Sequence, residues 1–330
     1  MFSIGLLSTA KINIEALLNP VRRRDDCQIT AVASRHWEKA QNYAVHHTIP
    51  KAYGSYQALL EDHQIDAIYI STPNSLHSSW VKAGLEAGKH ILCEKPLVCT
   101  YQELTELKNL ALRQNLLFME AMHYQYHPAL IDFFRLIDVG ILGPLSYVSA
   151  KLRYYRPPVG DIRLDPHLKG GCLMHLGCYC LDAITRIIKH PLEFTNLHLT
   201  ERTPAIDLAC HGTLTTTNQA IKAEFVCDFS GEVFDSEIKV VGDKGEVLLT
   251  SALNPAVIQG FIHDIFSLKT TFPDIPLLSP GKGRNTYDFQ LDYFISLLKE
   301  KDHTPRLNEQ ATILLEKGSI LVNDLLKEPM

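Results

Sequence analysis

Three consecutive residues, Glu94-Lys95-Pro96, carry side chains that could do chemistry. They directly follow His90–Cys93, an apolar run typical of a buried strand. Open α/β sheets bind their ligands at the carboxyl ends of such strands. Pro96 restricts Lys95 to an extended backbone and allows a cis peptide bond. A lysine fixed there could stabilise the alkoxide that forms when hydride leaves or reaches a carbonyl carbon, or it could simply pair with Glu94.

A second candidate site follows the first apolar run, at Ser8-Thr9-Ala10-Lys11-Ile12. Rossmann domains hold a dinucleotide pyrophosphate at this place, usually on G-x-G-x-x-G, which is reduced here to S-x-A-x-x-N. Small side chains would still let the backbone approach a phosphate, and the hydroxyls of Ser8 and Thr9 could donate to it. An ordinary strand-to-helix turn explains this segment equally well.

The second apolar run, Ile29–Ala33, leads into Ser34-Arg35-His36. Domains that prefer NAD usually carry an acidic residue here, which binds the ribose hydroxyls. No acid is present, and a 2'-phosphate could pair with Arg35 and accept a hydrogen bond from Ser34. The two residues therefore favour NADP, unless Arg35 is only a solvated charge at a strand end.

Other reactive side chains give weaker predictions. Tyr154, Tyr155 and Arg156 could line a substrate pocket, or the two tyrosines could be aromatic residues of an edge strand. His123 and His127 have the spacing of two metal ligands on a helix, but Pro128 argues against that geometry. The eight cysteines contain no CxxC pair and no regular spacing, so we expect reduced thiols, no disulfide framework and no metal site.

The first third of the chain must position the lysine and the two turns. Short apolar runs alternate there with amphipathic stretches of helical length, which predicts a doubly wound parallel sheet. Ser55 and the pair Thr100 and Glu103 are start signals for two of the helices. The expected strands are Ile4–Leu7, Ile29–Ala33, Ala67–Ser71, His90–Cys93 and Leu116–Glu120.

The second half has longer strands with polar alternation, which predicts an α+β domain with a large, mostly antiparallel open sheet. Gly242–Gly245 has the composition of a hairpin turn. Two helical patterns, Tyr287–Lys299 and Asn308–Lys327, could pack on this sheet or return to the first domain. The expected strands are Ser146–Tyr155, Phe194–Glu201, Leu208–Thr216, Ala220–Phe229, Glu237–Val241 and Glu246–Leu249.

Composition excludes several classes of protein. The hydrophobic content of 46% and the lack of a long apolar run predict a soluble protein. The net charge of -5, with both signs interspersed, provides no basic stripe for nucleic acid. The first residues run straight into an apolar strand without a secretory signal, so we expect a cytoplasmic protein. Neither a G-x-S-x-G elbow nor an H-E-x-x-H helix supports a hydrolase.

Several motifs together resemble the glucose-fructose oxidoreductase, inositol dehydrogenase and MocA family across nearly the whole chain. The start, 5–12, and the segment 162–166 are most similar to its NADP-dependent D-xylose dehydrogenases and dimeric dihydrodiol dehydrogenases. The other motifs are Thr72–His77 (TPNSLH), Glu86–Leu97 (EAGKHILCEKPL), Glu120–Met122 with His127-Pro128, and Gly170–Tyr179 (GGCLMHLGCY).

The resemblance implies roles for individual residues. Lys95 would be the catalytic lysine and Tyr179 the general acid and base, with its pKa, ordinarily near 10, lowered by the nearby ammonium. Glu94 would border the nicotinamide. A further set would line the cofactor crevice: Thr72, Pro73, Asn74 and His77. The substrate side would consist of Tyr155, Arg163, His175 and Tyr179.

One residue departs from the family pattern. His175 stands where the family usually has an acid, four residues before Tyr179 and therefore on the same face of a helix. His175 could orient the substrate hydroxyl or carry the proton, since its pKa lies near neutral. It could also mark altered chemistry, or be merely structural.

These expectations define two domains: an NADP-binding Rossmann domain over residues 1–122, and a substrate-binding and oligomerisation domain over 123–330. The resemblance implies a homodimer or homotetramer. The expected reaction moves a hydride between NADP, or alternatively NAD, and a sugar, cyclic polyol or dihydrodiol. The reverse reaction, reduction of a keto or anhydro sugar by NADPH, remains an alternative. A cofactor-binding regulatory protein without turnover is another.

Overall fold

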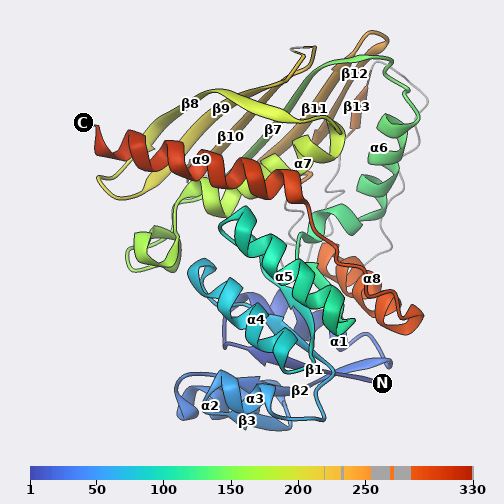
Figure 1. Cartoon of the computed structure of the whole chain (residues 1–330), viewed down its shortest axis with the longest axis vertical. Helices are drawn as coiled ribbons and strands as arrows, with labels where there is room; N and C mark the ends of the chain where they lie inside the picture. The colour runs from blue at the N-terminus through green and yellow to red at the C-terminus, as the bar shows by residue number, and fades with distance from the viewer. Residues whose placement is uncertain (219, 232–233, 254–267, 271–283, 329–330) are drawn as a thin grey trace. The chain divides into compact units, whose positions relative to one another are not determined.

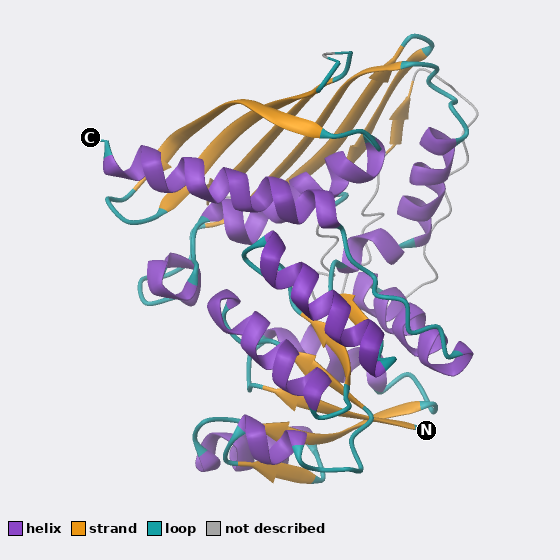
Figure 2. Ribbon diagram, viewed as in Figure 1, coloured by secondary structure: helices purple, strands orange, loops and turns teal. Residues whose placement is uncertain are grey.

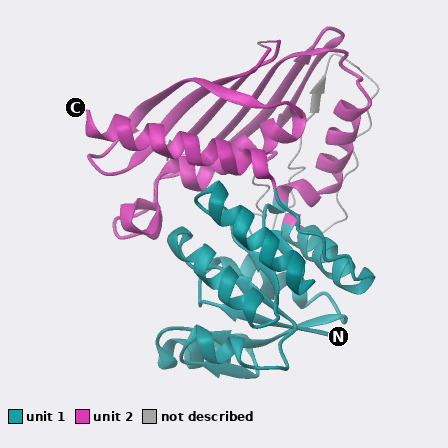
Figure 3. Cartoon of the chain, viewed as in Figure 1, with its two compact units in different colours: residues 1–123, 287–307 teal, residues 124–286, 308–330 magenta. Residues whose placement is uncertain are grey.

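The computed structural model describes the chain except for residues 219, 232–233, 254–267, 271–283 and 329–330. The chain forms two compact units (Figure 3). Unit 1 contains Met1–His123 and Tyr287–Leu307, and unit 2 contains Tyr124–Thr286 and Asn308–Met330. Helix α8 therefore belongs to unit 1, and helix α9 belongs to unit 2.

Unit 1 contains a parallel sheet of six strands in the order β3-β2-β1-β4-β5-β6. This confirms the predicted doubly wound fold, although the short β3 was not expected. Figure 1 labels β1, β2 and β3 of this sheet. The strands are β1 (Phe2–Leu7), β2 (Cys27–Ala33), β3 (Lys51–Tyr53), β4 (Ala67–Ile70), β5 (His90–Cys93) and β6 (Phe118–Glu120). The helices are α1 (Asn19–Val21), α2 (Trp37–His47), α3 (Tyr56–Leu60), α4 (His77–Glu86), α5 (Tyr101–Gln114) and α8 (Thr286–Glu300).

Two predicted helix starts are present in unit 1. Ser55 Oγ accepts a hydrogen bond of 3.1 Å from the Ala58 amide at the start of α3. Thr100 Oγ1 accepts from the Glu103 amide at 3.2 Å, and Glu103 Oε2 accepts from the Thr100 amide at 3.1 Å. These reciprocal bonds form a capping box, which satisfies amides that α5 leaves unpaired at its first turn.

Ion pairs attach α8 to the start of unit 1. The guanidinium of Arg23 donates twice to the Asp288 carboxylate, each time at 2.8 Å, and Lys299 donates to Asp26 at 2.6 Å. After α8, the backbone of Arg306 bonds to Phe118 and Glu120 at the edge of β6. Residues far apart in the sequence thus complete the edge of the unit 1 sheet.

Unit 2 contains a seven-stranded sheet in the order β13-β12-β11-β7-β10-β9-β8. Only β7 and β10 pair in parallel, so the sheet is mostly antiparallel, as predicted. Its strands are β7 (Leu145–Tyr155), β8 (Leu192–Arg202), β9 (Asp207–Thr216), β10 (Lys222–Gly231), β11 (Asp235–Gly242), β12 (Gly245–Thr250) and β13 (Leu268–Thr270). Helices α6 (Pro128–Asp138), α7 (Cys178–Ile187) and α9 (Glu309–Lys327) complete the unit.

Helices α7 and α9 lie across one face of this sheet (Figure 2). The hairpin between β11 and β12 turns at Asp243-Lys244, because Gly242 and Gly245 are register partners. Gly245 has a φ of 149°, a backbone conformation that favours glycine. A sheet covered by helices on one face explains the alternation of buried and exposed residues along its strands.

Within the described residues, no helix combines the length and the apolar character that crossing a membrane requires. None of the eight cysteines, all within the described residues, forms a disulfide, and seven of them are buried.

Candidate active site

The turn after β1 is fixed by a polar network at the carboxyl ends of β1 and β4. Ser8 Oγ lies 2.7 Å from Ser71 Oγ, which donates to Asn13 Oδ1 at 2.6 Å. The amide of Ala10 donates to Ser8 Oγ at 3.1 Å. The sheet order changes direction between these two strands, which is where open α/β sheets bind ligands. Ser8 therefore shapes the turn, and its bond to a phosphate stays a prediction.

The end of β2 carries the two residues predicted to select NADP. Ser34 is buried, and its hydroxyl accepts from the His36 amide at 3.3 Å. Arg35 is exposed, and its positive charge opposes the increase that burial causes in the pKa of Tyr56. The guanidinium is therefore held near the end of the strand and remains accessible to a ligand.

His77 connects the loops that follow β4 and β5. Its Nε2 lies 2.8 Å from the carbonyl oxygen of Thr72, and its Nδ1 lies 2.8 Å from that of Pro96. The imidazole is 1% exposed, and burial lowers its pKa while the two carbonyls oppose that shift. His77 thus positions Thr72 on one loop and Lys95 on the other. The Lys95–Pro96 peptide bond is cis, as the sequence allowed.

Burial shifts the pKa values of the ionisable groups around Lys95. Burial raises the pKa of the Glu94 carboxyl, whereas the Lys95 ammonium and a hydrogen bond from the Tyr69 hydroxyl lower it. Burial also lowers the pKa of His123 to about 3, and the positive charge of Lys95 adds to that shift. The His123 ring lies 4.2 Å from the Tyr287 ring. At neutral pH, Lys95 therefore lies near an uncharged histidine.

A buried hydroxyl in the same loop supports a cofactor site. Thr72 is 5% exposed, and its Oγ1 has no hydrogen-bond partner among the described residues. A buried hydroxyl without a partner costs about 1 to 3 kcal/mol. A ligand amide or hydroxyl would satisfy it, so the residues at the ends of β4 and β5 suit a dinucleotide.

In unit 2, Tyr179 lies in a continuous helical run. The run starts with a π-helical turn, Leu173–Gly177, and continues as α7. Tyr179 is 6% exposed, and its ring lies 6.1 Å from the Tyr124 ring. The Tyr124 hydroxyl donates to Asp182 at 2.5 Å, and Asp182 also accepts from Arg186 at 2.8 Å. This buried network holds the helix in place one turn beyond Tyr179.

His175 shares its surroundings with Arg163. Arg163 donates twice to Asp161 at 2.9 Å, and its guanidinium lies 5.8 Å from the centre of the Tyr154 ring. The hydrogen bonds from Arg163 are the main cause of the lowered pKa of Asp161, and the charge of His175 lowers this pKa further. A cation, a carboxylate, an imidazole and a phenol therefore lie together, a combination able to bind a polyhydroxylated molecule.

Tyr155 lies on the other face of β7. Residues 148, 150 and 152 are buried, whereas Tyr155 is 49% exposed. Because side chains alternate along a strand, Tyr154 lies on the helix-covered face and Tyr155 on the open face. Tyr154 is thus the tyrosine that contacts Arg163, and the substrate role expected for Tyr155 stays a prediction.

Family models match both units of the chain. Residues 3–122 match an oxidoreductase family with an NAD-binding Rossmann fold, and residues 133–248 match the GFO/IDH/MocA C-terminal domain. The chain belongs to the GFO/IDH/MocA family. This confirms the resemblance that its motifs indicate.

Relatives of this GFO/IDH/MocA protein include enzymes of different specificity. A D-xylose 1-dehydrogenase (NADP(+)) of Haloferax volcanii is 36% identical over 57% of both chains. A trans-1,2-dihydrobenzene-1,2-diol dehydrogenase of Xenopus tropicalis is 36% identical over 49% of both. A dTDP-3,4-didehydro-2,6-dideoxy-alpha-D-glucose 3-reductase of Streptomyces antibioticus is 31% identical over 76% of both. The first two matches span about half the length of those relatives.

Solved structures share the fold over almost the whole length. The aldose-aldose oxidoreductase from Caulobacter crescentus, complexed with glycerol, superposes with a TM-score of 0.83 at 19% identity, over 99% of this chain and 97% of its own. A 3-ketoreductase from Actinomadura kijaniata, a mutant in complex with TDP-benzene and NADP, gives 0.79 at 23% identity, over 97% and 96%.

Sequence reasoning missed several residues of the two sites. Tyr69 lies inside an apolar strand, so nothing in its pattern indicates a bond to Glu94. Asp182 and Tyr124 come from separate segments, and their pairing has no local sequence signal. His123 was considered only as a metal ligand. It lies in a short 3-10 helix, while His127 caps α6, so the two residues share no helix, as Pro128 indicated.

Proposed function

We propose that this chain transfers a hydride between NADP and a secondary or hemiacetal carbon of a sugar, a cyclic polyol or a dihydrodiol. The observation that carries the proposal is the arrangement at the ends of β4 and β5. There, His77 bonds the backbone carbonyls of Thr72 and of Pro96, which follows Lys95. The buried Thr72 hydroxyl has no hydrogen-bond partner within the described part of the chain. The relatives that oxidise D-xylose or dihydrodiols support this class of substrate.

The bound cofactor supplies hydride chemistry, and the protein supplies charge and proton transfer. In the oxidising direction, Tyr179 takes the proton of the substrate hydroxyl, while Lys95 stabilises the negative charge that develops on this oxygen. In the reducing direction, Tyr179 donates that proton. Thr72, Pro73, Asn74 and Glu94 form the cofactor side.

We also propose that His175, Arg163 and Tyr154 bind the hydroxyl groups of the substrate. Asp161 holds the Arg163 guanidinium in a planar, two-bond geometry suited to presenting its remaining donors. Asp161 already supplies a carboxylate in this cluster. A histidine at position 175, where the family usually has an acid, is therefore compatible with substrate binding.

Two single variants test the proposed roles. Lys95→Ala should lower kcat by about 10² to 10³ through lost charge stabilisation. Tyr179→Phe should lower it by about 10² to 10⁴ through lost proton transfer. Initial rates would be measured with pentoses, hexoses, inositols and dihydrodiols, using NADP and NAD, and with keto sugars and NADPH.

Lys82→Ala, which changes an exposed lysine of α4, is the control and should keep full activity. Quenching of tryptophan fluorescence should show that Tyr179→Phe still binds NADPH. If the unaltered protein binds NADPH but turns over nothing in the panel, the regulatory alternative replaces the enzyme. A keto-sugar substrate with NADPH would favour reduction, as the dTDP-sugar reductase relatives do.

The assembly and location are further parts of the proposal. We propose a homodimer or homotetramer, because the face of the unit 2 sheet opposite α7 and α9 presents alternate, partly exposed side chains. Light scattering of the purified chain should give twice or four times its mass of 37.2 kDa. Free thiols favour a reducing cytoplasm.

A further inference from the structure

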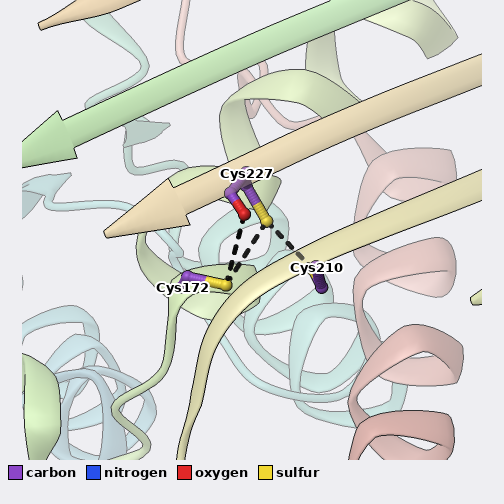
Figure 4. Close-up of side chains that lie close together, drawn as sticks. All are labelled: Cys172, Cys210 and Cys227. Carbon is purple, nitrogen blue, oxygen red and sulfur yellow. Dashed lines mark hydrogen bonds between the residues drawn. The ribbon is translucent and has the colours of Figure 1, made fainter. Parts of the chain in front are cut away.

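Three thiols from distant parts of unit 2 meet in its core (Figure 4). The sulfurs of Cys172, Cys210 and Cys227 all lie within 4.8 Å of one another, and all three residues are buried. The Cys227 sulfur lies 3.1 Å from that of Cys210 and 3.7 Å from that of Cys172. None of these groups has a part in the proposed hydride transfer.

The fold explains why the thiols meet. Cys210 on β9 and Cys227 on β10 are direct partners in the antiparallel register, so their side chains leave the sheet on the same face. Cys172 immediately precedes the helical run Leu173–Ile187, which crosses that face. The three cysteines thus come from two neighbouring strands and from the start of one helical run.

A carboxylate lies beside one of the three thiols. Asp207 is 4% exposed, and its Oδ2 lies 3.2 Å from the Cys172 sulfur. The same oxygen accepts from the Leu173 amide at 2.7 Å, which fixes the carboxylate beside the thiols. A Cβ atom at position 171 would lie only 2.0 Å from Asp207 Oδ1. Residue 171 must therefore be glycine for Asp207 to lie so close to the backbone.

The distances suit a tetrahedral zinc ion. Zinc binds thiolates at about 2.3 Å, which places two sulfur ligands of one ion roughly 3.8 Å apart. The pair Cys172 and Cys227, at 3.7 Å, already has this separation. Cys210 and Cys227, now 3.1 Å apart, need to separate by about 0.7 Å. A disulfide between them would instead need the sulfurs to approach to about 2.05 Å.

A cavity also lies beside Asp207. Asp207 lines a cavity of about 70 Å³ between the segment before the helical run and α9. On this measure a single water needs roughly 10 to 15 Å³, so the cavity has room for a small ion. Lys169, Ser319 and Asn323 give this cavity polar walls.

We propose that Cys172, Cys210, Cys227 and Asp207 form a structural zinc site. The thiols would lose their protons on binding, and the ion would join β9, β10 and the helix that carries Tyr179. Four protein ligands leave no open position, so the site stabilises the fold and takes no substrate.

Metal analysis of the whole purified chain tests the proposal. After growth with zinc and dialysis without chelator, we expect about one zinc per chain by mass spectrometry. Cys210→Ser should lower zinc content by on the order of tenfold or more. Cys27→Ser is the matched control, because Cys27 is equally buried but lies in unit 1, and it should keep its zinc.

Cobalt substitution in the unaltered chain keeps the test independent of variants that fail to fold. Metal-free chain with added Co²⁺ should show the intense visible bands of a tetrahedral thiolate complex. Asp207→Asn, whose amide oxygen still accepts from Leu173, should bind zinc more weakly while retaining its circular dichroism. A chain that holds no zinc and gives no such bands overturns the proposal, as does loss of two titratable thiols to a disulfide in the fresh protein.

Discussion

At the scale of single residues, the chemistry depends on side chains whose partners limit what they can do. His77 is fully engaged with two carbonyl oxygens, so it positions other groups and does not exchange protons with a substrate. Glu94 is restrained by Tyr69 and lies near the Lys95 charge. Lys95 is therefore the residue of this loop best suited to stabilise developing negative charge.

Arg35 provides a prediction about cofactor choice. Arg35→Ala should raise the KM for NADP by about 10-fold to 100-fold, because a charge-assisted hydrogen bond to a phosphate contributes about 1.5 to 3 kcal/mol. The KM for NAD should hardly change, since NAD has no 2'-phosphate. Steady-state rates with both cofactors at saturating substrate measure this difference.

Lys39→Ala, an exposed change on α2, serves as the control for surface charge. Equal losses with NADP and NAD would show that Arg35 contributes only general electrostatic attraction. A chain that prefers NAD from the outset would contradict the role given to Ser34 and Arg35.

At the scale of elements, the position of each helix depends on how the helix begins and on the residues that it packs against. The helix carrying Tyr179 is buried along its length and is held by Asp182, which bonds Tyr124, Arg186 and Asn308. Helix α5 lies near the surface and depends more on its first turn. The two helices should therefore respond differently to loss of a polar side chain.

Thr100→Ala removes one half of the capping box of α5. We expect a loss of about 1 kcal/mol in the free energy of unfolding, because the Glu103 amide loses its acceptor. Thr105→Ala on the same helix is a matched control. Thr105 is exposed and donates to the Tyr101 carbonyl, so its change should stay within about 0.5 kcal/mol. Urea unfolding followed by circular dichroism compares the two, and equal losses would contradict the capping role.

At the scale of the whole molecule, two buried histidines and one half-buried histidine make stability depend on pH. Burial lowers the pKa of His90 to about 4, that of His127 to about 4 and that of His123 to about 3. The unfolded chain binds these protons near pH 6.5, whereas the folded chain does not. Their contribution to stability is thus complete above about pH 6.5 and is lost as pH falls towards about 4.

The steepness of this loss can be measured and altered. Each such histidine contributes up to about 1.4 kcal/mol per pH unit. His90→Asn should make the dependence shallower, since its amide oxygen can replace Nδ1 as the acceptor for the Leu117 amide. Urea midpoints between about pH 7 and about pH 4.5 would be compared as slopes. An unchanged slope in the variant would exclude His90 as a source of the effect.

The amino-acid sequence alone determined the elements and their order. Strand positions, the capping box and the hairpin at Gly242–Gly245 follow from local periodicity and turn chemistry, which neighbouring residues decide. The motifs around Thr72, Lys95 and Tyr179 also indicated the family, because they are contiguous. The short strand β3 and helix α6 were missed, since three residues give no periodicity and Pro128 was interpreted only as a helix breaker.

Only the tertiary structure decided which distant side chains meet. Cys172, Cys210 and Cys227 have no regular spacing, yet strand register and a crossing helix bring their sulfurs together. The bonds of Tyr69 to Glu94 and of Tyr124 to Asp182 likewise join segments that are far apart in sequence. Such contacts depend on how sheets and helices pack, and packing is a property of the folded chain that no local pattern encodes.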